Sequence, residues 1–294
     1  MITSFQALAN SLLNTTKRTK LVAANATDEH TLSAIVHAVE AGFVEAFLVG
    51  DAAKTADTQL ITSLQNIHII NVPDTEQAAR EAVRMLRNGE ADALMKGLMN
   101  TDVLLKAVLD KEKGILPAGK VLSHIGVLEI PKYHKLLFFT DAAVIPSPTL
   151  EQRIAQIQYA IQTAKSFGVN QAKIALLHAS EKPNQKIQYT QDYLAILEMK
   201  DKFGDAIIDG PLDISLSIDP ESVEIKGVST PVNGDADILV FPNIASANCF
   251  YKAMTRFADA KMAGILQGTD KPVILMSRSE TTESKFYSIA MACL

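Results

Sequence analysis

The C-terminal stretch KPVILMSRSETTESKFYSIAMACL, residues 271–294, indicates the fold of the whole chain. Residues 272–276 have the length and the apolar, partly β-branched content of a buried strand, and residues 281–292 place apolar side chains at helical intervals. The serines and threonines between them are natural helix N-caps, and Arg278 adds a planar fork of donors that suits phosphate. Because N–H groups at a helix start attract negative charge, we interpret this turn as an anion site. The alternative is an ordinary strand-to-helix turn with a solvated arginine.

A second segment repeats this layout. Residues 92–109, DALMKGLMNTDVLLKAVL, form a short apolar strand, a turn and an apolar-periodic helix. The turn and the helix start offer a lysine point charge, a glycine that permits close backbone approach, two candidate N-caps, and a second lysine about one turn inside the helix. The two cation-bearing turns could meet on one ligand, or the lysines could simply be solvated. The residues assigned to this second turn are Lys96, Gly97, Asn100, Thr101 and Lys106.

The composition indicates a large globular core. The chain has 294 residues, of which 48% are hydrophobic, and this size fits two moderate domains better than one small module. A net charge of −5 disfavours a nucleic-acid binder, although a local basic pocket for a phosphorylated small molecule is compatible with an acidic exterior.

The cysteines and the N-terminus favour a cytoplasmic protein. Cys249 and Cys293 lack metal-ligand or CxxC spacing, and we expect both to be reduced, with Cys293 a small buried hydrophobe. No apolar run reaches the roughly 18 residues that cross a bilayer. At the N-terminus the charges follow the apolar residues, which is the reverse of a secretory signal.

Strands and helices alternate through the first part of the chain, which predicts a parallel sheet with helices on both faces. Asp28 and Thr75 are expected N-caps, and Gly42 and Gly89 stand where C-caps belong. The expected helices are residues 4–14, 28–41 and 75–88, and the expected strands are residues 21–24, 46–49, 68–72 and 93–95.

A hairpin interrupts this alternation. Residues 122–130 and 135–144 read as two longer strands joined by a turn at Pro131, so the sheet should be mixed. A second alternating block follows, which suggests two α/β domains and a cleft, with ligands outside the carboxyl ends of strands. Its expected helices are residues 150–168, 188–203, 212–218 and 247–257, and its expected strands are residues 173–177, 206–209, 238–242 and 264–266.

Taken in order, several segments resemble the phosphate acetyltransferase and phosphate butyryltransferase family, and most closely its butyryltransferase branch. They are MKGLMNTDVLLKAVL from Met95, LSHIGVLEIP from Leu122, LLFFTDAAV from Leu136, DGPLDISLSIDPESVEIKG from Asp209, DADILVFPNIASANCFYKAM from Asp235 and SRSETTESKFYSIA from Ser277. The resemblance implies two α/β/α domains with an isocitrate and isopropylmalate dehydrogenase-like core and mainly parallel sheets. It places residues 1–138 and 267–294 in the first domain and residues 139–266 in the second.

The resemblance also implies a reaction, the reversible transfer of an acyl group between coenzyme A and inorganic phosphate. It involves a ternary complex, no metal, no permanently bound cofactor and no acyl-enzyme. The implied catalytic residues are Ser277, which hydrogen-bonds the thiol or the carbonyl, and Arg278, which grips phosphate and stabilises developing charge.

The sequence departs from the acetyltransferase pattern at two places. Where acetyltransferases have an aspartate proposed as the thiol base, this chain has Ser284, so Glu283 becomes the candidate base, or else a first-turn glutamate that the helix dipole favours. Where they have a serine-rich loop followed by arginine, this chain has Lys106, which holds phosphate only as a point charge. We therefore expect Thr101, Lys96 and Lys106 to bind phosphate or the CoA pyrophosphate.

Further candidate lining residues lie at strand ends. Asp141 could orient a cation or cap a turn, and Asn248 could line the cleft or cap a helix. His124 and His178 are expected to be satisfied structural imidazoles, and no His, Cys and carboxylate spacing suggests a metal. The lining candidates are Thr140, Asp141, Asn243, Asn248 and Lys252.

The sequence is compatible with three functions. The first is a cytoplasmic phosphate acyltransferase for a short acyl group, butyryl preferred over acetyl, which self-associates into a dimer or larger homo-oligomer and needs neither nucleic acid nor membrane. The second is a non-catalytic acyl-CoA sensor of the same fold, and the third is a metal-dependent dehydrogenase. An extra methylene contributes only about 1 to 3 kcal/mol to discrimination, so sequence does not determine acyl length.

Overall fold

The computed structural model describes residues 1–13, 17–56, 61 and 65–294. The chain divides into two compact units, which we name the terminal unit (Phe5–Leu122 and Ala263–Leu294) and the middle unit (Met1–Ser4 and Ser123–Met262). Each is an α/β unit in which most strands are parallel, as the sequence predicts. None of the helices in the described chain is long and apolar enough to cross a membrane.

The terminal unit has a sheet with strand order β3-β2-β1-β4-β11-β10. The strands from β3 to β11 are parallel, and β10 pairs with β11 in the antiparallel direction. The strands are β1 (Thr19–Ala24), β2 (Val44–Gly50), β3 (Ile67–Asn71), β4 (Ala93–Lys96), β10 (Lys261–Gln267) and β11 (Val273–Ile274). The helices are α1 (Phe5–Leu12), α2 (Glu29–Glu40), α3 (Ala52–Ala56), α4 (Thr75–Arg87), α5 (Thr101–Val108) and α11 (Thr282–Ala292).

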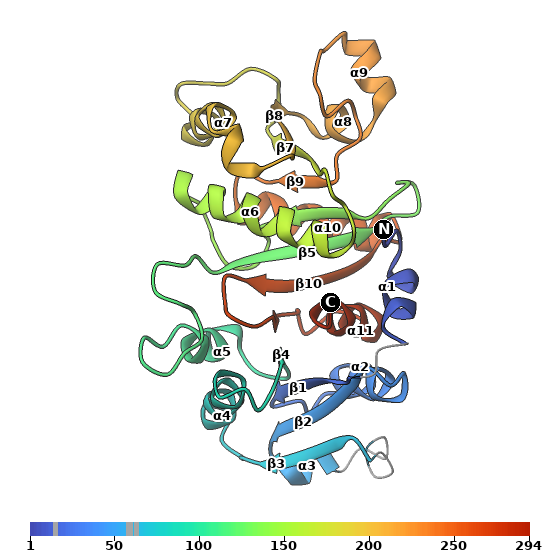
Figure 1. Ribbon diagram of the computed structural model, residues 1–294, viewed down its shortest axis with the longest axis vertical. Coiled ribbons are helices and arrows are strands. Elements are labelled where there is room, and N and C mark those ends of the chain that lie inside the picture. The colour runs from blue at the N-terminus through green and yellow to red at the C-terminus, as the bar shows by residue number, and fades with distance from the viewer. Residues whose placement is uncertain (14–16, 57–60, 62–64) are drawn as a thin grey trace. The chain divides into compact units, whose positions relative to one another are not determined.

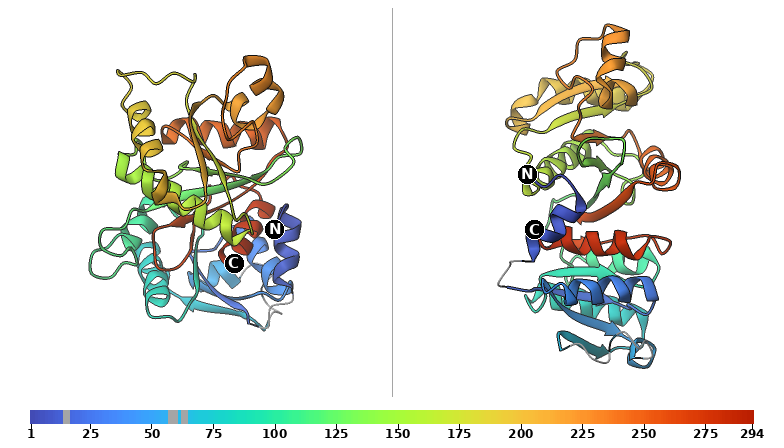
Figure 2. Two further views of the ribbon diagram at one scale, coloured as in Figure 1. Left: turned by 45° about the horizontal axis from the view of Figure 1, so that its top comes forward. Right: turned by 90° about the vertical axis from the view of Figure 1, so that its right-hand side faces the viewer.

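The helices cover both faces of this sheet. In Figure 1, α4 and α5 lie on one side of the strands, and α1, α2 and α11 lie on the other. Helix α11 packs alongside α2, although the two come from opposite ends of the chain (Figure 2). Strand β4 is buried along its whole length, which explains the uninterrupted apolar run before Lys96.

Local sequence signals explain most helix ends. Asp28 caps α2 as predicted, and Gly42 and Gly89 follow α2 and α4 with positive φ. The prediction of Thr75 as a cap is wrong, because the Asp74 carboxylate accepts the hydrogen bond from the Gln77 N–H at 2.8 Å. Asn14, the last residue of the first predicted helix, lies outside the described residues.

Strand β11 is shorter than the predicted strand at residues 272–276. Its last paired residue, Ile274, lies opposite Met95 of β4. The β4 chain then bends at Gly97 toward the turn after β1, where the Gly97 N–H bonds the Ala24 carbonyl at 2.9 Å. Leu275 and Met276 stay buried, but the pairing of β11 with β4 ends at Ile274.

The middle unit has strand order β5-β6-β9-β7-β8. Strands β5 and β6 form the predicted antiparallel hairpin, and the other neighbouring pairs are parallel. The strands are β5 (Ser123–Glu129), β6 (Leu137–Thr140), β7 (Lys173–Leu177), β8 (Ile207–Leu212) and β9 (Ile238–Val240). The helices are α6 (Leu150–Ser166), α7 (Gln188–Glu198), the 3-10 helix η1 (Lys200–Phe203), α8 (Ile214–Ile218), α9 (Pro220–Lys226) and α10 (Ile244–Phe257).

Several helices in this unit differ from prediction. Helix α10 begins three residues before the predicted start, because Asn243 accepts the Ser246 N–H at 3.0 Å and caps it. Helix α9 was not predicted, although Asp219 caps its start, Pro220 occupies its first position and Gly227 follows its end with positive φ. The predicted helix at residues 188–203 divides into α7 and η1.

Candidate active site

Three turns of the terminal unit lie at the carboxyl ends of adjacent parallel strands. Ala24 of β1 pairs with Lys96 of β4, and Ile274 of β11 pairs with Met95. The turns that follow these strands, residues 25–28, 97–100 and 275–281, therefore leave the sheet at one edge. Such an edge is where open parallel sheets bind ligands.

Arg278 joins two of these turns. Its Nη2 donates a hydrogen bond to Oδ1 of Asn100 at 2.5 Å. Asn100 occupies the N-cap position of α5 but makes no side-chain cap hydrogen bond, because its amide oxygen faces Arg278 instead. The turn identified at each end of this unit therefore contributes one side chain to a single polar contact, and both side chains are exposed to solvent.

Lys96 is buried beneath the same turn, with 5% of its surface exposed. Its Nζ donates to the carbonyl oxygens of Gly97 and Met99, both at 3.2 Å. Burial, together with the positive charges of Arg278 and Lys285, lowers the pKa of Lys96 to about 8, against a smaller opposing effect of Asp28. A lysine in this setting exchanges a proton near neutral pH, whereas a solvated lysine remains charged.

Sequence reasoning missed Lys285, which is 3% exposed. Its Nζ donates to Oδ1 of Asp28 at 3.1 Å and to Oγ1 of Thr31 at 3.0 Å, so it ties α11 to the start of α2. A positive charge in the first turn of a helix is unfavourable for the helix dipole, and this was the only signal in the sequence. Its partner Asp28 lies 257 positions away, so only the fold identifies the pair.

Gly97 is required by the packing of the turns on each other. A Cβ at this position would lie 2.4 Å from the Asn25 carbonyl oxygen and 2.6 Å from the backbone of Ala26. The close approach predicted for Gly97 is therefore to the turn after β1. Asn25 reinforces the same contact, because its Nδ2 donates to the Leu98 carbonyl at 2.6 Å.

Ser277 and Ser279 of the third turn are exposed, whereas Glu280 in the same turn is buried. Ser277 precedes Arg278, and its hydroxyl lies 3.1 Å from that of Ser279. The α11 cap is Thr281, whose Oγ1 accepts the Ser284 N–H at 3.1 Å, as the threonine-rich junction predicts. Glu283 is exposed in the first turn of α11, where its Oε1 accepts a hydrogen bond from the Tyr287 hydroxyl at 3.2 Å.

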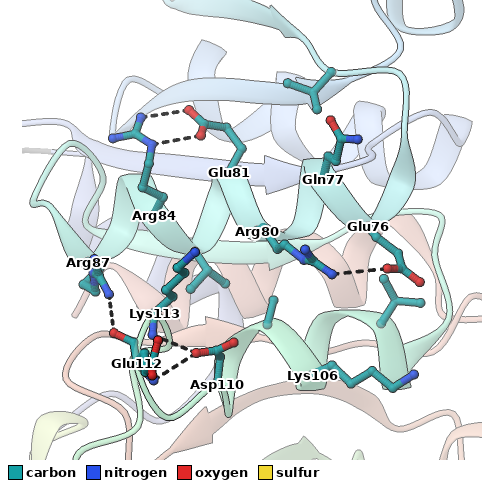
Figure 3. A pocket seen from close by; sticks show the side chains of 14 residues that line it. Glu76, Gln77, Arg80, Glu81, Arg84, Arg87, Lys106, Asp110, Glu112 and Lys113 are labelled. Carbon is teal, nitrogen blue, oxygen red and sulfur yellow. Dashed lines mark hydrogen bonds and ion pairs between the residues drawn. The ribbon is translucent and has the colours of Figure 1, made fainter.

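Thr101 and Lys106 belong to α5. Thr101 is its first residue and is half-buried, directly after Asn100. Lys106 is exposed and lines a cavity of about 830 Å³ between α4 and α5. Figure 3 shows Lys106 across this cavity from Arg80, which pairs with Glu76 at 3.4 Å. The lining of this cavity does not include Lys96, Asn100 or Arg278.

In the middle unit, Asp141 follows β6 and organises a turn. Its Oδ1 accepts the N–H groups of Ala143 and Val144 at 2.8 and 2.9 Å, and its Oδ2 accepts the Ile145 N–H at 3.2 Å. Oδ2 also accepts the Ser123 hydroxyl at 2.9 Å. Thr140, beside it, is fully buried. Of the two roles foreseen for Asp141, turn capping is the one visible in its contacts.

The other candidates of the middle unit lie on α10. Asn243 caps this helix, whereas Asn248 lies within it and donates from Nδ2 to the Ala142 carbonyl at 3.1 Å. Strands β6 and β9 are parallel neighbours, so the turns that carry these residues leave the sheet at one edge. Lys252 is exposed, with its Nζ 5.9 Å from the Tyr251 ring centroid.

The histidines and cysteines have varied surroundings. His178 Nδ1 bonds the Tyr189 hydroxyl at 2.7 Å, as expected for a structural imidazole. His124 departs from that expectation, since its buried Nδ1 has no hydrogen-bond partner among the described residues. Both cysteines are free, and burial raises the pKa of Cys293 to about 11. Within the described residues, His, Cys, Asp and Glu form no group of three or more that could hold a metal ion.

The chain is similar to a known protein family and to several of its members. A family model described as phosphate acetyl/butaryl transferase matches residues 74–293. The phosphate butyryltransferase of Clostridium acetobutylicum is 38% identical over 279 residues, which cover 94% of this chain and 92% of that protein. The phosphate acetyltransferase of Thermotoga maritima is 35% identical over 282 residues, which cover 95% of each chain.

A solved structure shares the fold as well as the sequence. The crystal structure of a branched-chain phosphotransacylase from Enterococcus faecalis superposes with a TM-score of 0.80 at 32% identity. The match covers 93% of this chain and 97% of that one.

Proposed function

Because the chain belongs to the phosphate acetyl/butaryl transferase family, we propose that it reversibly transfers a short acyl group between coenzyme A and inorganic phosphate, butyryl in preference to acetyl. The observation that supports this assignment is the contact between Arg278 and Asn100 above the buried Lys96. Arg278 and Lys96 thereby place two positive charges at the edge of the sheet where an anionic substrate would bind.

The chemistry requires such a site. The thiol of coenzyme A, with an ordinary pKa of about 8.5 for a thiol, must lose its proton to attack the carbonyl carbon of an acyl phosphate. Negative charge then develops on the carbonyl oxygen and on the departing phosphate, and a preorganised cation stabilises both. Because the acyl group passes directly between bound substrates, no acyl-enzyme forms in this proposal.

In this proposal Arg278 grips the phosphate through its planar fork, and Asn100 holds the guanidinium in place. Ser277, adjacent in the turn, donates a hydrogen bond to the thiol or to the carbonyl oxygen. Thr101 at the start of α5 and Lys96 add contacts to phosphate, and Gly97 keeps the turn close-packed. Lys106, on the cavity between α4 and α5, is assigned to the pyrophosphate of coenzyme A.

Glu283 is the carboxylate candidate for the thiol base. It is exposed and held by Tyr287. If Glu283 is the base, Glu283→Gln lowers kcat by at least about 100-fold with little change in the KM for phosphate. Unchanged turnover in this variant rules the carboxylate out.

In the middle unit, we retain the sequence candidates that follow β6 and β9 as proposed ligand-binding residues of that unit. Lys252 is exposed, and the side-chain oxygen of Asn243 caps α10. The contacts of Asp141 and Asn248 are with the protein's own turn. Coenzyme A and phosphate are substrates in this scheme, and no cofactor is assigned. The cytoplasmic location, the homo-oligomer and the domain limits at residues 138 and 266 stay predictions. The proposed lining residues are Thr140, Asp141, Asn243, Asn248 and Lys252.

The direct test is phosphate-dependent release of the coenzyme A thiol, measured with a thiol reagent across acetyl-, propionyl-, butyryl- and longer acyl-CoA. We expect release from short thioesters, with kcat/KM highest for butyryl-CoA, and formation of the matching acyl phosphate. Binding of acyl-CoA without release would instead indicate a sensor, and turnover that needs a nicotinamide would indicate a dehydrogenase.

A further inference from the structure

Lys96 has surroundings that differ from those of an ordinary anion-binding lysine. Its side chain is buried, and within the described chain both hydrogen-bond partners of its Nζ are backbone carbonyls. A buried ammonium is usually paired with a carboxylate, because an unpaired charge is costly to remove from water. In this position the neutral amine is favoured over the charged form more than at the protein surface.

The nearest charged groups reinforce this preference. Arg278 approaches Lys96 from the turn before α11, and Lys285 from the first turn of α11. Asp28, at the start of α2, opposes this effect on Lys96, but it is itself bonded to the Lys285 ammonium at 3.1 Å. Asp102 and Lys106 of α5 and Glu283 of α11 are exposed to solvent. Glu280, in the turn before α11, is buried, with 8% of its surface exposed.

The backbone places Lys96 beneath the turn that carries Asn100. Its ammonium is bonded to the Met99 carbonyl, one residue before Asn100, and Asn100 holds Arg278. Lys96 therefore lies under the same short turn that would bind phosphate. The side chain is also anchored by its own neighbour, because its second partner is the Gly97 carbonyl.

We propose that the Lys96 amine exchanges the proton of the coenzyme A thiol, and that Lys285 is a positioning residue whose buried charge keeps Lys96 ready to accept it. This inference rests on the proposed acyltransferase function and adds a catalytic role to Lys96 beyond binding phosphate. It assigns to Lys96 the step for which Glu283 was the sequence candidate.

The step balances in both directions. Toward acyl-CoA, the thiol proton moves to the neutral Nζ, the sulfur electron pair forms the bond to the acyl carbon, and the carbon–oxygen bond to phosphate breaks with its electrons on phosphate. Toward acyl phosphate, a phosphate oxygen attacks the thioester carbon and the carbon–sulfur bond breaks. The Lys96 ammonium then returns its proton to the departing thiolate.

The proton affinity of Lys96 suits this exchange. With burial as the main cause and the two cations as the next, its pKa lies at about 8, close to that of a thiol. Both protonation states are then populated near neutral pH. The plot of kcat against pH should contain a limb near pH 8. When the thiol is the substrate, kcat should rise with pH along this limb, because the neutral amine is the active form in that direction.

The first experiment replaces the amine. Lys96→Arg keeps the positive charge for phosphate but cannot accept a proton near neutral pH. We expect kcat to fall at least about 100-fold, with the KM for phosphate within about threefold of the wild-type value. In Lys96→Ala, added primary alkylamines should restore part of the lost kcat in proportion to the concentration of free amine. Circular dichroism and thermal melts establish that each variant is folded.

The second experiment changes the neighbour. Lys285→Met removes a positive charge and leaves Asp28 free to attract the Lys96 ammonium, so both effects raise the pKa of Lys96. We expect the pH limb of kcat in the thiol-consuming direction to move upward by at least half a pH unit. Lys285→Arg retains the charge and should keep the limb near its wild-type position. A purely structural role for Lys285 would lower activity without moving the limb.

The outcomes separate this inference from the function on which it rests. If the wild-type protein shows no phosphate-dependent thiol release, the proposed function itself fails. If the wild type is active but Lys96→Arg keeps its kcat, the inference about Lys96 alone is overturned. The same holds if the pH limb is unmoved in Lys285→Met, or if it disappears in Glu283→Gln while it persists in Lys96→Arg.

Discussion

Nη2 of Arg278 donates a hydrogen bond to Oδ1 of Asn100 across 2.5 Å, although the two residues are 178 positions apart in the chain. This contact connects the turn after β4 with the turn before α11. Asn100 stands at the N-cap of α5 without capping it. A side chain that leaves a helix end to orient an arginine has a role that helix stability alone does not require.

Asn100 variants test that role. Asn100→Ala should lower kcat/KM about tenfold, since a hydrogen bond to a charged group contributes about 1.5 to 3 kcal/mol and solvent replaces part of it. Asn100→Asp should act differently, because a carboxylate pairs with Arg278 and repels phosphate, and we expect the KM for phosphate to rise more than tenfold. Initial rates with varied phosphate and acyl-CoA measure both effects. Equal phosphate KM values in the two variants and the wild type would show that Arg278 does not bind phosphate.

Lys96 should reduce the stability of the folded chain at neutral pH. Its pKa is about 8 when folded, lowered chiefly by burial, and about 10.4 when unfolded, so between these values the unfolded chain binds more protons. The free energy of unfolding therefore rises with pH over this range, and below pH 8 the buried ammonium is destabilising. Lys96→Met should raise the free energy of unfolding by about 1 to 3 kcal/mol at pH 7, and by less at pH 9.5.

Urea unfolding of wild type and variant at both pH values measures this difference. Lys106→Met is the matched control, because Lys106 is exposed and its replacement should change stability by less than about 0.5 kcal/mol at either pH. A stability difference for Lys96→Met that is the same at pH 7 and pH 9.5 would contradict a lowered pKa of Lys96.

Asp141 should be a stability residue of the middle unit. Three backbone N–H groups and the Ser123 hydroxyl bond its buried carboxylate. Asp141→Asn removes one acceptor oxygen and presents an amide group to these donors, so we expect a loss of about 2 to 4 kcal/mol in the free energy of unfolding. Asp205→Asn, at an exposed position, is the control for urea unfolding. A loss below about 0.5 kcal/mol would mean that the turn does not depend on this carboxylate.

The sequence predicted much of the fold because the local signals are strong. Strand β7 has the predicted bounds, and β4 and α4 differ from prediction by one residue at one end. The hairpin of β5 and β6 followed from two apolar runs around Pro131. Helix α9 was missed although its Asp219-Pro220 start and Gly227 end are ordinary signals, because the segment has few apolar residues to show a helical period.

The site was harder to predict because its contacts join residues far apart in the chain. Cap-rich turns and cations identified Arg278 and Asn100 as candidates, but their hydrogen bond depends on β4 and β11 being neighbours in the sheet. Lys285 gave almost no sequence signal, since a lysine near a helix start is usually solvated. Its partner Asp28 was recognised only as a helix cap.

The measurement that tests the central claim most directly is phosphate-dependent thiol release from butyryl-CoA by the wild-type protein and by Arg278→Ala, at equal concentrations of folded protein. The account predicts turnover by the wild type with formation of butyryl phosphate, and a loss of at least about 100-fold in kcat/KM for the variant. A variant that retains near-wild-type kcat/KM would remove Arg278 from the transition state and contradict the site described for the terminal unit.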